Sequence, residues 1–252
     1  MKLAVITGAS KGLGKSVAKE FLRKKIDVIG VSRTDNEELH ELANEQEVKY
    51  TFLSADLTLM DSLQTVISKL KSQLVEQSIK TLYVINNAAM VHPIERAENV
   101  TAELMLQHYQ INVIAPTTII NELLTDTSNG NYQLVGVNIT SGAAERPISG
   151  WSAYCSSKAS INMYTKTVAI EQDEKNTGHK IIAFSPGIMD TAMQGEIRKS
   201  TTDQFSDVAT FQAYKNQNKL SQPETVAHAL VRILKQPSFL ENGKIYYISE
   251  LQ

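Results

Sequence analysis

The chain has little of several features that mark whole classes of proteins. Its 252 residues include one cysteine, which excludes an internal disulfide and leads us to expect a reducing, cytoplasmic compartment. The five histidines show no metal-ligand spacing, so we expect no metal site. The 25 lysines and arginines nearly balance the 27 aspartates and glutamates, and a net charge of −2 gives no electrostatic drive toward nucleic acid or an anionic membrane.

Long hydrophobic runs are missing as well. The longest apolar stretches, such as Leu3 to Ile6 and Leu82 to Ile85, are far shorter than the ~20 residues that a membrane-spanning helix needs. A glycine motif begins at Thr7, so we expect the first strand to start almost at Met1 with no targeting segment before it. The apolar fraction of 42% excludes a disordered chain.

Short apolar runs alternate with longer segments of helical periodicity along the whole sequence. The runs predict seven strands, at 3–6, 28–31, 50–53, 82–85, 134–139, 181–184 and 245–248. Apolar residues at helical spacing predict the main helices, at 12–25, 57–74, 104–124, 153–171 and 224–234. Strands that are almost continuously apolar are typical of a parallel sheet covered on both faces. We therefore predict an α/β fold: a single doubly wound Rossmann-type domain over residues 1–252, with a seven-stranded parallel sheet.

One segment interrupts this alternation. Residues 190–221 connect the sixth predicted strand to the last helix and are mostly polar. Connections of this length are usually lids or binding segments, so we expect the segment to cover a substrate.

A glycine-rich loop follows the first predicted strand and begins the first predicted helix. The spacing Gly-x3-Gly-x-Gly permits a tight turn and a close approach of the backbone to a pyrophosphate, which would face the helix N-terminus. This placement predicts a dinucleotide site rather than a turn without a ligand, formed by Gly8, Ser10, Lys11, Gly12, Leu13 and Gly14.

The end of the second predicted strand indicates which dinucleotide binds. An NAD site has an acidic side chain there for the ribose 2′-hydroxyl, whereas this chain has Ser32 and Arg33. The Arg33 guanidinium can pair with a 2′-phosphate, and Lys11 would add a second positive charge. These residues favour NADP(H), with Asp35 as the competing residue for NAD.

A tyrosine and a lysine are spaced for proton transfer. Tyr154 and Lys158 lie four residues apart in the helix predicted after the fifth strand, on one helix face. A nearby cation lowers a phenol pKa from ~10 toward neutrality, so that the tyrosine can exchange a proton with a substrate oxygen. The hydroxyl of Ser141, at the end of that strand, would bind the same oxygen. By itself such a pair also fits an ordinary helix face.

Taken in order, these motifs resemble the short-chain dehydrogenase/reductase family. They are the glycine loop, Asn86-Asn87-Ala88-Ala89, Asn112, Ser141, Tyr154-x3-Lys158 and Pro186-Gly187, and the match covers essentially the whole chain. Residues 150–155 and 187–194 resemble the benzil reductase and sepiapterin reductase subgroup of bacilli. The chain departs from the family at Ala89, where glycine is usual, and the extra methyl group fits if the backbone φ there is negative.

The resemblance implies a role for each matching residue. Tyr154 would donate a proton during reduction, Lys158 would bind the nicotinamide ribose and lower the pKa of the tyrosine, and Ser141 would polarise the carbonyl. Asn112 would hold a water that links Lys158 to solvent. Further cofactor contacts would come from Asp56, Leu57, Asn87 and Ala88 on the adenine side, and from Pro186, Gly187, Ile188 and Thr191 on the nicotinamide side.

The resemblance also implies an activity. The chain would be a cytoplasmic NADPH-dependent carbonyl reductase for a ketone or 1,2-diketone, benzil-like or sepiapterin-like, and a homodimer or homotetramer. Trp151, Met189 and Met193 would contact the substrate beside Ser141 and Tyr154. Two alternatives remain: an NAD-dependent alcohol dehydrogenase of the same family, and a non-catalytic NADP(H)-responsive binding protein. We expect Cys155 only to pack, because helical neighbours point about 100° apart.

Overall fold

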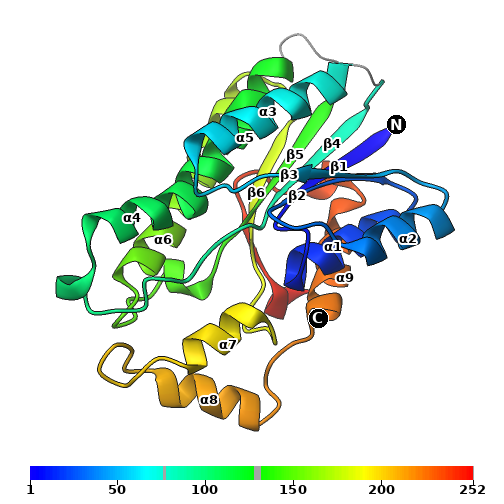
Figure 1. Cartoon of the computed structure of the whole chain (residues 1–252). Coiled ribbons are helices and arrows are strands. Elements are labelled where there is room, and N and C mark those ends of the chain that lie inside the picture. The colour runs from blue at the N-terminus through cyan, green and yellow to red at the C-terminus, as the bar shows by residue number, and fades with distance from the viewer. Residues whose placement is uncertain (76–77, 128–131, 252) are drawn as a thin grey trace.

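A parallel sheet of seven strands forms the centre of the computed structural model, which describes residues 1–75, 78–127 and 132–251 (Figure 1). The strand order is β3-β2-β1-β4-β5-β6-β7, and every neighbouring pair is parallel. The strands are β1 (Lys2–Thr7), β2 (Asp27–Ser32), β3 (Tyr50–Ser54), β4 (Thr81–Asn86), β5 (Gln133–Ile139), β6 (Lys180–Ser185) and β7 (Ile245–Tyr247). All seven predicted strands are confirmed, with ends that differ by one residue.

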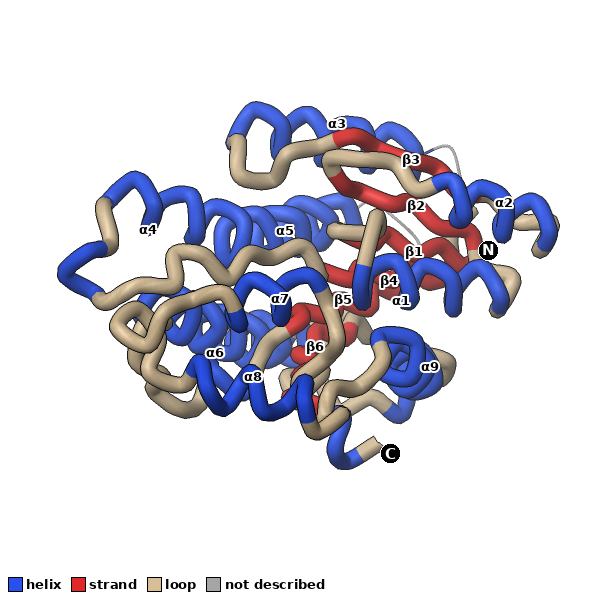
Figure 2. Tube along the Cα trace, turned by 60° about the horizontal axis from the view of Figure 1, so that its bottom comes forward, coloured by secondary structure: helices blue, strands red, loops and turns tan. Residues whose placement is uncertain are grey.

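Helices cover both faces of the sheet (Figure 2). One face carries α1 (Gly12–Arg23), α2 (Glu37–Glu45) and α9 (Pro223–Leu234), and the other carries α3 (Met60–Val75), α5 (Ala115–Thr127) and α6 (Ser152–Glu174). The doubly wound arrangement is therefore confirmed. Within the described ranges, no helix combines the length and the apolar character that crossing a bilayer requires.

The helix predicted over 104–124 is interrupted. It consists of α4 (Ala102–Tyr109), a π-helical turn (Gln110–Ile114) and α5. The turn contains Asn112, whose side chain is bonded to the backbone of Met90. Single π-turns inside helices are often found at functional sites.

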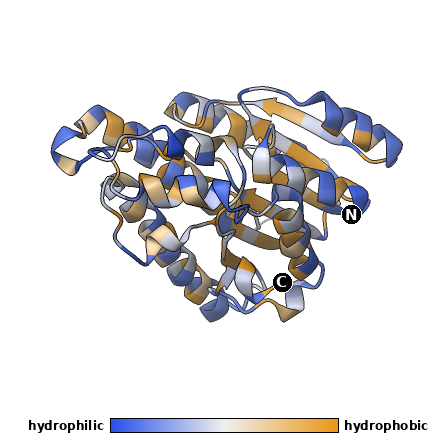
Figure 3. Cartoon of the chain, turned by 90° about the horizontal axis from the view of Figure 1, so that it is seen from below, coloured by the Kyte–Doolittle hydropathy of each residue, from blue (hydrophilic) through white to orange (hydrophobic). Residues whose placement is uncertain are grey.

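Alternate side chains of each strand enter two separate cores. On β1, Ala4 and Ile6 pack beneath α1 and α9, whereas Leu3 and Val5 pack beneath α3 and α5. Each such side chain, when fully buried, contributes about 1.5–3 kcal/mol relative to its exposed state. The almost continuous apolar pattern of the strands follows from burial on both faces, and Figure 3 shows these hydrophobic strands between the helices.

The strand order reverses between β1 and β4, and this leaves a crevice at the carboxyl ends of the strands. Thr7, the last residue of β1, accepts hydrogen bonds at its hydroxyl from the backbone N–H groups of Asn87 and Ala88, both at 3.0 Å. The Asn87 side chain donates back to the Thr7 carbonyl, also at 3.0 Å. These bonds join the loops that follow β1 and β4.

Two glycines permit this junction. Gly8 has a φ of +70°, in the left-handed region that favours glycine. A Cβ atom at Gly14 would lie 2.2 Å from the Gly8 carbonyl oxygen and 2.5 Å from the Asn87 amide nitrogen. The spacing of the loop glycines therefore follows from the close packing of α1 against the loop.

Residues 190–221 form two short helices, α7 (Ala192–Arg198) and α8 (Val208–Asn216), that project beyond the carboxyl edge of the sheet (Figure 1). The segment looks polar in sequence, but it has an apolar interior. Phe205 and Phe211 pack on Trp151, with ring centroids 4.8 and 5.3 Å away. Arg96 donates a hydrogen bond to the Asp203 carbonyl at 2.7 Å and ties the connecting loop to the body of the protein.

We expect Gly14→Ala to lower the free energy of unfolding by about 2–3 kcal/mol, because the backbone oxygen that its Cβ meets cannot rotate away. Gly195→Ala is the matched control. It is also a helical glycine, but the nearest atom to its added Cβ lies 3.9 Å away, so the gain in helix propensity should raise stability by about 0.5–1 kcal/mol. Urea unfolding measures both values. Equal stability of the two variants would contradict the close-packing account.

Candidate active site

A cleft of about 1210 Å³ opens along the carboxyl edge of the sheet. Sites for drug-sized ligands have volumes of roughly 300–1,000 Å³, so this cleft has room for a larger ligand or for two ligands together. Its walls come from the loops that follow β1 to β6 and from α7. The parallel arrangement places all of these loops at one edge.

Every site residue predicted from the sequence lines this cleft except Gly14 and Asn112. Gly14 packs behind the glycine loop, and Asn112 lies behind the loop after β4. The lining residues that were predicted are Gly8, Ser10, Lys11, Gly12, Leu13, Ser32, Arg33, Asp56, Leu57, Asn87, Ala88, Ser141, Trp151, Tyr154, Lys158, Pro186, Gly187, Ile188, Met189, Thr191 and Met193.

The end of the cleft beside α1 is positively charged. Lys11 and Arg33 line it, and within the described ranges neither side chain has a hydrogen bond or an ion pair. The competing residue, Asp35, does not line the cleft. Its carboxylate instead contacts His40 Nε2 at 2.9 Å and accepts a hydrogen bond from the Asn36 backbone at 2.7 Å. Arg33 rather than Asp35 is thus placed for a ligand.

Two further lysines at this end were not predicted. Lys15 and Lys19 line the cleft, and both bind the carboxylate of Glu38, with a Lys15 Nζ–Glu38 distance of 2.7 Å. These two hydrogen bonds lower the pKa of Glu38 to about 2. The recurrence of lysine at 11, 15 and 19, every fourth residue of one helix face, is the sequence signal that would have found them.

Ser141, Tyr154 and Lys158 meet in the middle of the cleft. Ser141 follows β5, and the other two come from successive turns of α6. The side chains of Tyr154 and Lys158 are both buried, and Ser141 is near enough to the Tyr154 phenol to lower its pKa. Lys158 Nζ donates to the Ile139 carbonyl at 2.9 Å and lies 5.7 Å from the centroid of the Tyr154 ring.

Burial controls the protonation of this pair. It raises the pKa of Tyr154 to about 12, although Ser141 lowers it. Lys158 is bonded to the Ile139 carbonyl, and desolvation of the phenol is the largest effect on the pKa of Tyr154. That Lys158 lowers the pKa of the tyrosine toward neutrality stays a prediction. A phenol with this pKa is protonated at neutral pH. Burial also lowers the pKa of Lys158 to about 8.

Asn112 is held away from the cleft wall. Its Oδ1 accepts a hydrogen bond from the Met90 N–H, and its Nδ2 donates to the Met90 carbonyl, both at 2.9 Å. This pair of bonds fixes the chain that follows β4. Ala89 lies in this chain segment and is not one of the four non-glycine residues with a positive φ. Its methyl group therefore fits, as expected.

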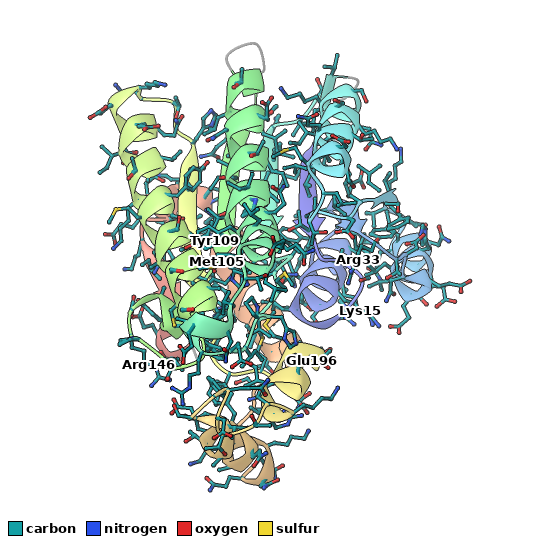
Figure 4. All side chains as sticks on the ribbon, turned by 60° about the vertical axis from the view of Figure 1, so that its left-hand side comes forward. Lys15, Arg33, Met105, Tyr109, Arg146 and Glu196 are labelled. Carbon is teal, nitrogen blue, oxygen red and sulfur yellow. The ribbon has the colours of Figure 1, made fainter. Side chains whose placement is uncertain are left out.

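The other end of the cleft is largely apolar. Met189, Met193 and Trp151 line it as predicted, and the Trp151 ring centroid lies 5.1 Å from that of Tyr154. Arg146 also lines the cleft there, away from Lys15 and Arg33, and was not predicted (Figure 4). Cys155 packs against the apolar cluster that contains Trp151 and Tyr154, as expected.

Polar atoms in this wall lack partners. Among the described residues, no group forms a hydrogen bond with Thr140 Oγ1, Trp151 Nε1 or Gln194 Nε2, and all three side chains are nearly fully buried. The Gln194 oxygen accepts a bond from Arg198 at 2.7 Å, which leaves the amide NH₂ as the unpartnered end. Sequence reasoning did not assign Thr140 or Gln194 to the site. In residues 1–75, 78–127 and 132–251, no cluster of metal-ligating side chains occurs.

Lys158→Met is expected to raise the free energy of unfolding at pH 7 by about 2 kcal/mol, because the buried cation is removed at the loss of one hydrogen bond. The folded-state pKa of Lys158 is about 8, against 10.5 ordinarily. Between these pH values the unfolded chain binds more protons, so the stability of the parent rises. The difference in the free energy of unfolding between the parent and the variant should therefore become smaller as the pH rises from 8 to 10.5. Urea unfolding at several pH values tests this, and a variant less stable than the parent at pH 7 would contradict it.

Comparison with known proteins agrees with this geometry. A family model described as short chain dehydrogenase matches residues 2–202. A benzil reductase ((S)-benzoin forming) of Bacillus cereus is 36% identical over 250 residues, which cover 99% of this chain and 100% of that protein. A sepiapterin reductase of Xenopus laevis is 28% identical over 212 residues, covering 80% of this chain and 78% of that protein.

A solved structure has the same architecture over almost its whole length. The short chain dehydrogenase/reductase YIR035C of Saccharomyces cerevisiae has a TM-score of 0.80 at 26% identity, covering 98% of this chain and 96% of that one. The family model, the full-length bacillar relative and this shared fold confirm the family that the motifs predict. The chain belongs to the short-chain dehydrogenase/reductase family of oxidoreductases.

Proposed function

We propose that the chain is an NADPH-dependent carbonyl reductase that converts a ketone or 1,2-diketone to the hydroxy compound. The observation that carries the proposal is the meeting of Ser141, Tyr154 and Lys158 in one cleft with the glycine loop. The benzil reductase of Bacillus cereus, similar over its full length, supports a diketone substrate. A pteridine side-chain ketone, as in sepiapterin, is the second candidate within the same class.

The residues of the cleft fit a bound NADPH. Gly8, Ser10, Lys11, Gly12 and Leu13 line the cleft at the start of α1, where a pyrophosphate would face the helix N-terminus. Lys11 and Arg33, which form no ion pair within the described ranges, would supply cations for a 2′-phosphate. Bound NADPH would supply the hydride to the carbonyl carbon. We assign its adenine side to Ser10, Leu13, Ser32, Asp56, Leu57, Asn87 and Ala88, and its nicotinamide side to Pro186, Gly187, Ile188 and Thr191.

The protein's own groups act on the substrate oxygen. Tyr154, which burial keeps protonated at neutral pH, would give its hydroxyl proton to that oxygen as the carbon is reduced. The Ser141 hydroxyl, which is near the phenol, would hold the oxygen beside it. Lys158 would carry the charge that stabilises the resulting phenolate and would bind the ribose. We also propose that Asn112, whose side chain is bonded to the backbone of Met90, holds a water that links Lys158 to solvent and returns the proton.

The apolar end of the cleft would hold the rest of the substrate. Trp151, Met189 and Met193 would contact its carbon frame. The buried N–H groups of Trp151 and Gln194 have no partner in the part of the chain that the structure describes. They favour a substrate with a second oxygen, as in a 1,2-diketone, since buried donors are normally bonded. We propose that the chain is one domain in which residues 190–221 cover the bound substrate.

The alternatives have less support. The position of Asp35, bonded to His40 outside the cleft, favours NADP(H) over the NAD of an alcohol dehydrogenase. A binding protein without catalysis would not need the buried Tyr154 and Lys158, whose desolvation is costly.

Tyr154→Phe is expected to lower kcat/KM for a ketone by about 10²–10⁴-fold, because it removes the proton donor and little else. The affinity for NADPH, measured by fluorescence titration, should stay nearly unchanged. Tyr109→Phe is the matched control, since the Tyr109 hydroxyl donates to Ser156 at 2.8 Å outside the cleft and its loss should leave turnover intact. A kcat/KM of Tyr154→Phe within a few-fold of that of the parent would contradict the proposed mechanism.

We also propose a cytoplasmic homodimer or homotetramer. The helices α4 and α6 expose large apolar side chains, including Leu106 (71% exposed), Met163 (64%) and Ile170 (59%). An interface along these helices would bury all three.

Light scattering should give a multiple of the 27.9 kDa chain mass. Leu106→Glu should shift the distribution toward the monomer, because it places a charge in the proposed interface. Leu59→Glu changes an equally apolar residue, 58% exposed, outside α4 and α6, and should leave the mass unchanged. A monomeric parent would contradict the assembly.

A further inference from the structure

A histidine that the mechanism does not use lies directly behind the catalytic pair. His108, in the last turn of α4, is fully buried. Its Nδ1 is 2.6 Å from the carbonyl oxygen of His92, and its Nε2 is 3.0 Å from Ser157 Oγ and 2.9 Å from Asn112 Nδ2. The side chain does not line the cleft. Both ring nitrogens are therefore bonded, but to protein groups alone.

These partners determine the protonation state of the ring. A carbonyl oxygen only accepts, so Nδ1 carries the hydrogen that is donated to His92. Nε2 is then the acceptor for the amide N–H of Asn112, because the one hydroxyl hydrogen of Ser157 is donated to the Tyr154 carbonyl. Burial and the nearby Lys158 cation lower the pKa of His108, which keeps the ring neutral. Tyr109 and Tyr154 also face the ring, with ring centroids 6.3 and 6.1 Å away.

The ring connects two elements that carry the site. Asn112, on one side, fixes the chain after β4 through its two bonds to Met90 in the cleft wall. Ser157, on the other side, directly precedes Lys158 and is 2.9 Å from the backbone carbonyl of Tyr154, to which its hydroxyl donates. Asn112 and Ser157 also contact each other at 3.3 Å. A change in the ring position would therefore move both the Met90 wall and the helix turn that bears the tyrosine.

We propose that His108 is a positioning residue. Its Nε2 is bonded to Asn112 in the π-turn and contacts Ser157 Oγ, beside Lys158 on α6, at 3.0 Å. The ring thereby sets where the tyrosine hydroxyl stands relative to the wall that holds the substrate. This inference rests on the proposed reductase function. Misplacement of a reacting group by about 1 Å costs on the order of 100-fold in rate, so a group that only positions can have a large effect.

His108→Leu removes both bonds of the ring, and we expect it to lower kcat about 10–100-fold with little change in the KM for NADPH. His108→Gln retains an amide at the reach of Nε2 and should recover most of the lost kcat, which a purely space-filling role would not produce. His40→Leu is the matched control, because His40 is bonded to Asp35 outside the cleft. It should behave as the parent does.

A second measurement does not depend on turnover or on the folding of a variant. Nitrogen-15 NMR of the parent should show the neutral Nδ1–H tautomer of His108 throughout the neutral pH range. An imidazolium or an Nε2–H tautomer would overturn the arrangement.

The kinetic outcomes separate the two proposals. A parent that reduces no ketone overturns the reductase function itself. A parent that turns over, together with a His108→Leu variant of equal kcat or a His108→Gln variant as slow as His108→Leu, overturns only the positioning role.

Discussion

The packing of the glycine loop against the loop after β4 is the constraint on which the rest of the site depends. Thr7 and Asn87 exchange hydrogen bonds across the reversal in strand order, and α1 comes so close that no Cβ fits at Gly14. This contact directs the start of α1 into the crevice and places Lys11 at its edge. The cations of the first half of the chain and the tyrosine of the second half therefore share one cleft.

Desolvation is the second physical effect that shapes the site. It keeps Tyr154 protonated and lowers the pKa of Lys158, which suits the proton donation that we propose for the tyrosine. Backbone and buried polar groups surround the pair: the Ile139 carbonyl accepts a hydrogen bond from the ammonium group, and His108, the positioning residue that we propose, contacts Ser157 on the helix turn behind it. Stability and the proposed catalysis therefore place opposite demands on Lys158.

The sequence predicted the fold well because burial on both faces leaves a direct trace, seven short apolar runs. It also predicted most of the cleft, since parallel strands bring their carboxyl ends to one edge and the motifs follow those ends. It missed what depends on tertiary contacts. The π-turn at Asn112 is accompanied by bonds to Met90, and the pKa of Tyr154 depends on its burial by the surrounding protein. The role proposed for His108 depends on a partner distant in sequence, Ser157. The role proposed for Gln194 depends on an amide nitrogen that has no partner among the described residues.

The central claim is that the cleft binds NADPH and reduces a carbonyl compound. The most direct test measures kcat/KM of the parent protein with NADPH and with NADH, following the loss of nicotinamide absorbance over a panel of ketones and 1,2-diketones. The account predicts turnover of an aromatic 1,2-diketone with a clear preference for NADPH. A preference for NADH would contradict the role given to Arg33 and Lys11, and no consumption of either cofactor across the panel would contradict the reductase function.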